Sequence, residues 1–230
     1  LDAEPGMNRF VWDLRYDPPV QIPGAFYAGL PPRGPIALPG DYAVRLTAGG
    51  RTQSVPLTMA PDPRVKTPLT GLEQKFALSM QVYRDQDRLH RAVNDIRAVK
   101  AGVQETLHAA GTESKAGGES QRAKLTTSGD KLFQRAAGIE GQLMQVEIKG
   151  SEANLNFPGM LNEQIYSFSG LLEDADTAPN QQEIDTYAGL HSRLEAQLAD
   201  WAALKRAEVA DFCARARSEG QGGIPASVCP

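Results

Sequence analysis

The chain has 230 residues, of which 41% are hydrophobic and 23% are charged, proportions that are typical of a folded globular protein. Its net charge of −4 argues against a nucleic-acid-binding surface, because contacts with phosphates need clustered lysine and arginine. No apolar run approaches the ~20 residues of a membrane-spanning helix, and no signal peptide opens the chain, whose first residues indicate a cut from a longer sequence.

The first predicted element is a strand over residues 10–16. Phe10, Trp12, Leu14 and Tyr16 occupy every second position, which places four large side chains on one face of an extended chain. Such a face requires a partner sheet. The sequence that follows, DPPVQIPGAFYAGLPPRGPIALPG, is too rich in proline and glycine for a helix or a central strand, so we expect a long irregular connection.

Residues 41–59 predict a β-hairpin. Large apolar side chains alternate along both arms, and Ala48-Gly49-Gly50 between them supplies the turn. Pro56 lacks an N–H group, so the second arm should be an edge strand. The alternating residues are Tyr42, Val44 and Leu46 on the first arm and Val55, Leu57 and Met59 on the second.

From Thr70 onward, apolar residues recur at steps of three and four, which predicts four helices that each bury one stripe in an antiparallel bundle. The first should begin near residue 72 and run about 38 residues, or ~57 Å. The middle two are shorter, so the outer pair should project past them or pack against each other at one end. The breaks are expected at 111–120, 149–159 and 176–180, and the start signals at Thr70-x-x-Glu73 and Asn180-x-x-Glu183.

Two cysteines, Cys213 and Cys229, lie near the end of the sequence. Two explanations compete, a disulfide that closes a short loop and a pair of unrelated thiols. We favour the disulfide, which in the chain-entropy account stabilises the fold by ~3 kcal/mol for a loop of this size. It also favours an oxidising compartment. Metal binding by these cysteines is not expected, because no further ligands at metal-site spacing accompany them.

The sequence contains no nucleophile or phosphate-loop motif. His90 borders the apolar stripe of the first helix and His191 lies on that of the last, so the pair could bind a metal ion or act as a base. No metal-ligand spacing such as HxxxH or HExxH accompanies them, and we expect each imidazole to be hydrogen-bonded within or beside the helix seam. His108 should lie at a helix end, where a cation suits the dipole. No catalytic residue and no metal site are predicted.

Two further groups of residues have the composition of a possible site. Glu173, Asp174 and Asp176 suggest paired carboxylates or a calcium loop, but the EF-hand pattern is absent, and a solvated turn that caps the next helix is the better account. Trp12 beside Asp13 suggests an aromatic platform for a sugar. The competing interpretation is burial in a core, which is more usual for alternating aromatic residues on a strand.

Several longer stretches, taken together, resemble one protein family. They are similar to the C-terminal region of large bacterial proteins whose N-terminal part is a sortilin-type, Asp-box-repeat β-propeller, often labelled glycosyl hydrolases. The Asp-box motif S-x-D-x-G-x-T-W is absent here, and no catalytic residue carries over. The stretches span about residues 6–212 and are, in order, PGMNRFVWDLRY, LPGDYAVRLTAGGRTQSVPLTMAPDPRV, RLHRAVNDIR, LNFPGMLNEQI and LLEDADTAPNQQEIDTYAGLHSRLEAQLADW.

The resemblance implies a small Ig-like sandwich followed by a helical segment, in a protein that is exported to the periplasm or the outside of the cell. With the periodicity, it predicts an α+β fold: a partial Ig-like antiparallel β domain over 1–66, an antiparallel bundle of about four helices over 67–217 and a flexible tail over 218–230. The strands expected ahead of Gly6 are missing. The aromatic face of residues 10–16 must therefore be covered by the hairpin or dock on the bundle.

We expect this chain to be a non-catalytic structural and interaction module, with the N-terminal propeller of its parent protein as partner and with no cofactor. The alternative is a glycan-binding accessory module of a carbohydrate-active parent. Trp12, Tyr16, Phe26 and Tyr27 form the candidate surface for glycan binding or domain docking. A third hypothesis is an enzyme whose site spans this chain and the propeller.

Overall fold

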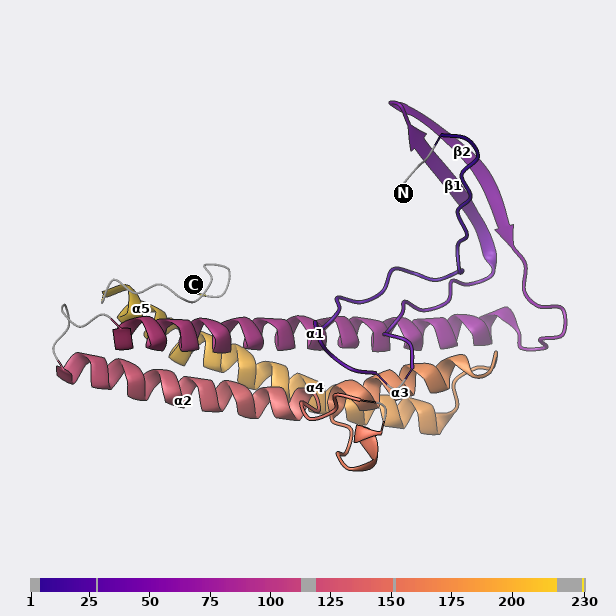
Figure 1. Cartoon of the computed structure of the whole chain (residues 1–230). Helices are drawn as coiled ribbons and strands as arrows, with labels where there is room; N and C mark the ends of the chain where they lie inside the picture. The colour runs from indigo at the N-terminus through magenta and orange to yellow at the C-terminus, as the bar shows by residue number, and fades with distance from the viewer. Residues whose placement is uncertain (1–4, 28, 113–118, 151, 219–228, 230) are drawn as a thin grey trace.

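The computed structural model describes residues 5–27, 29–112, 119–150, 152–218 and 229. Within them the fold is α+β and mostly helical, as predicted, with a two-stranded antiparallel sheet ahead of the helices (Figure 1). The strands are β1 (Gly40–Ala48) and β2 (Arg51–Met59), and the helices are α1 (Leu69–Thr112), α2 (Glu119–Leu143), η1 (Ala153–Leu155), α3 (Leu161–Glu173), α4 (Gln181–Leu204), the π-helical turn η2 (Lys205–Val209) and α5 (Ala210–Ser218).

The helices form an elongated bundle, which we call the rod, with three rows side by side (Figure 1). One row is α1, the second is α2 followed by α3, and the third is α4, η2 and α5 as one continuous helix. The prediction of four helical segments is confirmed, but the shorter pair lies end to end along the longer pair. The lengths explain this arrangement, because 25 residues in α2 and 13 in α3 together nearly match the 44 residues of α1.

The core of the rod follows the apolar stripes that the sequence predicts. The side chains meet where the rows face one another, and the central ones are completely buried because steps of three and four keep them on one face. The largest fully buried hydrophobic residues are Val82, Leu89, Val93 and Ile96 on α1, Leu125, Leu132 and Leu143 on α2, Leu161 on α3, and Leu194, Leu204 and Phe212 on the third row.

The predicted helix starts meet different outcomes. Asn180 caps α4 in a reciprocal capping box, in which Glu183 N donates to Asn180 Oδ1 at 2.9 Å and Asn180 N donates to Glu183 Oε2 at 2.8 Å. This prediction is confirmed. The start at Thr70 is wrong, because α1 begins at Leu69 and Thr70 already lies within its first turn.

The hairpin is confirmed in detail. Val44 pairs with Val55 and Tyr42 with Leu57, so the apolar residues of both arms share one face. Gly49 and Gly50 form the turn with φ of +55° and +74°, the left-handed pair that a two-residue hairpin needs. Figure 1 shows that β1 and β2 extend away from the rod.

The predicted strand over residues 10–16 is wrong, because this segment has only one isolated bridge, between Arg15 and Ile36. Local hydrogen bonds compete with the extended form. Arg15 N donates to Asp13 Oδ1 at 3.1 Å, and Trp12 Nε1 donates to Arg15 O at 2.8 Å. Leu14 takes a positive φ of 64°, which ends the alternation. The described residues therefore contain a sheet of two strands, and an Ig-like sandwich is not confirmed.

The proline-rich connection that follows lies along the rod and is fastened to α1. Val20 N donates to Asp87 Oδ1 at 2.9 Å, Asn94 Nδ2 donates to Gln21 O at 3.0 Å, and Ile22 is buried in the core of the rod. Arg15 adds a two-pronged ion pair with Glu173 of α3, at 2.6 and 2.9 Å. The connection thus fixes the base of the hairpin to the rod.

The cysteines close the far end of the rod. Cys213 on α5 and Cys229 form a disulfide, with their Cα atoms 6.0 Å apart. Residues 219–228 and 230 of the expected flexible tail lie outside the described residues. Within the described chain, no helix is both long enough and apolar enough to cross a membrane.

Candidate functional site

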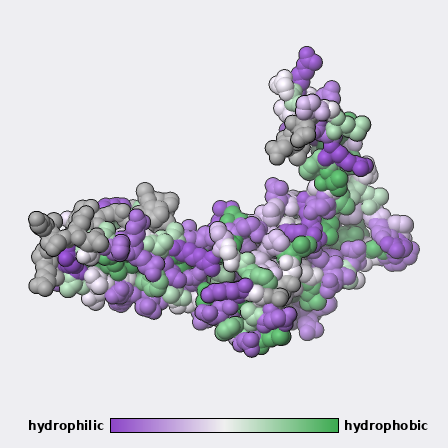
Figure 2. Space-filling model, viewed as in Figure 1, coloured by the Kyte–Doolittle hydropathy of each residue, from purple (hydrophilic) through white to green (hydrophobic). Residues whose placement is uncertain are grey.

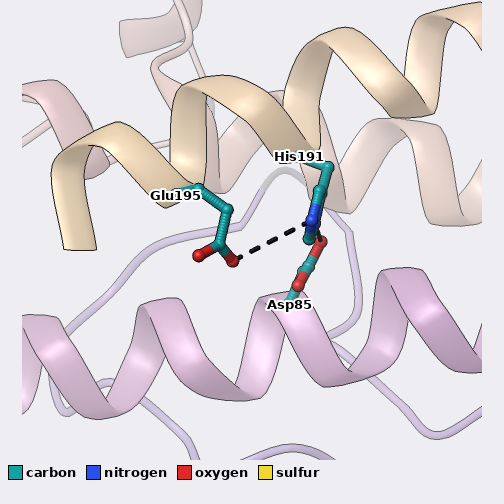
Figure 3. Close-up of side chains that lie close together, drawn as sticks. All are labelled: Asp85, His191 and Glu195. Atoms are coloured by element: carbon teal, nitrogen blue, oxygen red, sulfur yellow. Dashed lines mark hydrogen bonds and ion pairs between the residues drawn. The ribbon is translucent and has the colours of Figure 1, made fainter. Parts of the chain in front are cut away.

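Three potential metal-ligating side chains meet between α1 and α4, as Figure 3 shows. Asp85 comes from α1, whereas His191 and Glu195 come from α4, where a spacing of four residues puts them on the same face. One ligand atom from each lies within 4.8 Å of the other two. The parallel course of α1 and α4 brings the two helix faces together, although Asp85 and His191 are 106 residues apart.

Asp85 is the centre of this group, which we call the Asp85 cluster (Asp85, Arg88, Tyr187, His191 and Glu195). Asp85 is only 3% exposed, and three neighbouring side chains contact its carboxylate. Oδ2 accepts from the Tyr187 hydroxyl at 2.9 Å and lies 2.6 Å from His191 Nδ1, while Oδ1 accepts from Arg88 Nη1 at 3.3 Å. These contacts hold a buried carboxylate without leaving its oxygens unpaired.

Arg88 links the two carboxylates of the cluster, because the same guanidinium nitrogen also contacts Glu195 Oε1. This contact lowers the pKa of Glu195, chiefly through the hydrogen bond from Arg88. The pKa of Tyr187 is raised, first by burial and then by its hydrogen bond to Asp85. His191 Nε2 lies 4.0 Å from Glu195 Oε1, so the ring is held between the two carboxylates. The cluster can hold a cation or orient an imidazole.

His90 lies elsewhere and does not join His191. Its Nδ1 donates to the carbonyl oxygen of Val20, and its Nε2 lies 2.9 Å from Asn162 Oδ1 and 3.3 Å from the Tyr27 hydroxyl. Burial lowers the pKa of His90, and the hydrogen bonds of the ring to Val20 O and Asn162 Oδ1 oppose that shift. His90 therefore connects α1 with α3 and with the proline-rich connection.

A cavity of about 580 Å³ lies beside α3 and the start of α4. Phe26, Tyr27 and Tyr166 contribute aromatic rings, and Glu163 and Gln164 contribute polar groups. The rings of Tyr27 and Tyr166 are tilted against each other with centroids 5.0 Å apart. The pKa of Tyr27 is raised to about 12, mainly by burial. A cavity with aromatic walls and a few polar groups is a typical binding site for a small molecule or a sugar ring.

The four aromatic residues singled out in the sequence occupy three places. Phe26 and Tyr27 come together at this cavity. Trp12 is half-buried against Tyr42 of the hairpin, in an edge-on contact with centroids 5.6 Å apart. Tyr16 lies against Phe76 of α1, also at 5.6 Å. The structure thus places Trp12 at the base of the hairpin, Tyr16 on the rod, and Phe26 and Tyr27 at the cavity.

The acidic turn between α3 and α4 receives cations rather than capping α4. Glu173 pairs with Arg15, and Lys75 donates to Asp176 Oδ1 at 3.2 Å and to Ala175 O at 2.6 Å. Asp174 is the C-cap of α3, and Asn180 caps α4. The remaining histidine, His108, is exposed near the end of α1.

No family model, no curated protein and no solved structure matches this chain. The functional argument therefore depends on the geometry of the described residues. The Asp85 cluster was not predicted from the sequence, where His191 was considered only together with His90. The spacing His191-x-x-x-Glu195 was an available signal, but nothing local indicates that Asp85 faces it from another helix.

Proposed function

We propose that this chain is a non-catalytic structural and interaction module, in which the rod holds a β-hairpin that docks on another β domain. One observation carries the proposal: Val44, Leu46 and Val55 share one hairpin face and remain 49%, 59% and 60% exposed. A two-stranded hairpin is marginally stable by itself in water. An apolar face, and two outer edges that pair with no other strand among the described residues, suit a partner that adds strands or covers the face.

The base of the hairpin is held in a defined place, which suits docking rather than free movement. The Tyr42 hydroxyl donates to Leu38 O at 2.5 Å, and Trp12 packs against the Tyr42 ring. Between the hairpin foot and α1 lies a cavity of about 230 Å³, and Figure 2 shows apolar residues gathered there. Its wall includes Ile36, Met59 and Phe76.

The partner that fits the resemblance is the N-terminal propeller region of a larger exported protein. The disulfide between Cys213 and Cys229 supports export, since such bonds persist in oxidising compartments. In this proposal the module positions the propeller, and bond-making chemistry belongs elsewhere in the parent.

The test compares hydrogen exchange of residues 40–59 in this chain and in the full-length parent protein. We expect slow exchange of the hairpin only in the full-length protein, because docking there pairs its edges and covers its face. The double variant Val44→Thr/Val55→Thr should restore fast exchange in the parent. Arg45→Thr, on the opposite face of β1, is the matched control and should leave protection intact. Equal exchange in the two wild-type proteins would overturn the proposal.

The cavity beside α3 favours a second candidate, a glycan-binding accessory module. Phe26 and Tyr166 offer rings, and Glu163 and Gln164 offer hydrogen-bonding groups of the kind that recognise sugar hydroxyls. A glycan array with the wild type, Phe26→Ala and Tyr16→Ala tests it. Binding that disappears in Phe26→Ala but survives in Tyr16→Ala, which lies outside the cavity wall, supports this function; an array without binding removes it.

A further inference from the structure

The carboxylates of the Asp85 cluster outnumber its permanently charged cations. Asp85 and Glu195 contribute two carboxylates, which share the single guanidinium of Arg88. Asp85 is buried, so water screens the charge of its carboxylate only in part. Two carboxylates that share one guanidinium attract a further cation, or a cation that binds them more strongly than the guanidinium does.

We propose that Asp85, His191 and Glu195 form a binding site for a divalent transition-metal ion such as Zn²⁺, which replaces the Arg88 guanidinium as the cation shared by the two carboxylates. One imidazole nitrogen and two carboxylate oxygens are ligands that Zn²⁺ accepts, with water in the remaining position. The site goes beyond the docking function and does not depend on it.

The distances allow the ion to bind with small movements. Ligand atoms around a tetrahedral Zn²⁺ lie about 3.4 Å apart, because each bond is about 2.0–2.1 Å long. In the cluster, one ligand atom from each of the three residues lies within 4.8 Å of the other two, so small side-chain movements bring all three to this spacing. The Asp85 side chain is fixed at 5% exposure, whereas His191 at 43% and Glu195 at 45% have room to adjust.

The second requirement is that the Arg88 guanidinium can leave the two carboxylates. The Arg88 side chain is nearly half exposed, so it can swing into solvent when the metal ion arrives. Tyr187 keeps its place and holds Asp85 by donating to Oδ2, as a supporting residue behind a metal ligand does. The bound ion would link α4 to α1 and stabilise the rod, since a ligand that binds only the folded state raises its stability.

The test is titration of the intact chain with ZnCl₂ by calorimetry, together with Co²⁺ absorption in the visible range. We expect one ion per chain and a melting temperature that rises with Zn²⁺ concentration. His191→Ala should weaken Zn²⁺ binding by about tenfold or more. His108→Ala removes an exposed histidine away from the cluster and should leave binding unchanged. Glu195→Gln tests a second ligand at a half-exposed position, where folding is not at risk.

Arg88→Gln separates a metal site from a purely structural ion network. If Arg88 competes with the metal ion, its removal should tighten Zn²⁺ binding by about tenfold, although the metal-free protein becomes less stable. The proposal is wrong if the wild type binds no Zn²⁺, if His108→Ala weakens binding as much as His191→Ala, or if Arg88→Gln fails to tighten it.

Discussion

In the rod, apolar side chains from three rows of helices bury one another, whereas in the hairpin Val44, Leu46 and Val55 remain exposed. Phe212 is 1% exposed and Val55 is 60% exposed, although both continue a regular apolar period. The difference shows that the apolar period of a segment indicates which of its residues share a face, but not what covers that face. The rod has its partners within this chain, and the hairpin face does not among the described residues.

The largest expected effect is the loss of a core aromatic residue from the rod. Phe212 of α5 and Leu107 of α1 both lie against Gly129 of α2, where the three helices meet. Phe212→Ala should lower the free energy of unfolding by ~3–5 kcal/mol, because it removes a large buried ring and leaves a cavity. Urea denaturation followed by circular dichroism measures it. A loss below ~1 kcal/mol would show that this end of the rod is loosely packed.

The rod and the hairpin also differ in how far the sequence predicts them. Steps of three and four, the capping box at Asn180 and the Gly49-Gly50 turn are local signals, and the elements that depend on them are confirmed. The strand at residues 10–16 also had a local signal, alternation, but the side-chain hydrogen bonds of Trp12 and Asp13 prevailed. Alternation describes where side chains point only if the backbone stays extended.

The candidate sites depended on contacts between distant segments, which no local pattern contains. Asp85 and His191 meet because α1 and α4 lie in adjacent rows, and that arrangement follows from α2 and α3 lying in series (Figure 1). The cavity at Phe26 and Tyr27 likewise forms only because the proline-rich connection crosses onto α3. The aromatic composition was visible in the sequence, and its division among three places was not.

The second prediction concerns the disulfide at the far end of the rod. Cys213 and Cys229 are separated by 16 residues, so the bond restricts a short loop of the unfolded chain. Reduction should lower the free energy of unfolding by ~3 kcal/mol. Thermal denaturation with and without dithiothreitol measures the change. The double variant Cys213→Ala/Cys229→Ala should unfold like the reduced wild type and show no response to the reductant, and a reductant effect in that variant would contradict the assignment.

A smaller effect on stability is expected when a lower pH protonates His90, which attaches the connection beneath the hairpin to the rod. Burial lowers the pKa of His90 in the folded state from its usual 6.5, so the unfolded chain binds a proton first as pH falls. The contribution of His90 to stability is therefore complete above pH ~6.5 and decreases as pH falls from there toward the folded-state pKa. His90→Gln should lose this part of the pH dependence.

The matched control is His108→Gln, since His108 is exposed and has no hydrogen bond to the connection among the described contacts. Unfolding by urea at pH 7.5, 6.5 and 5.5 gives the comparison. Subtracting the variant from the wild type isolates His90 from other groups near it, among them Asp87 and Glu163, whose charges favour the protonated ring. A wild-type curve that stays parallel to that of His90→Gln would show that His90 does not titrate differently in the two states.

The smallest effect should come from the hairpin, where Val44 and Val55 face each other across the strands. In this chain Val44→Thr/Val55→Thr should change the free energy of unfolding by less than ~0.5 kcal/mol, because both side chains are half exposed and threonine keeps the strand preference. In the proposed full-length parent the same double variant should lower stability more, because the proposed docking would bury both residues. A large loss of stability in this chain alone would mean that its own residues already cover the hairpin face. The contrast between a covered rod and an uncovered hairpin would then be wrong.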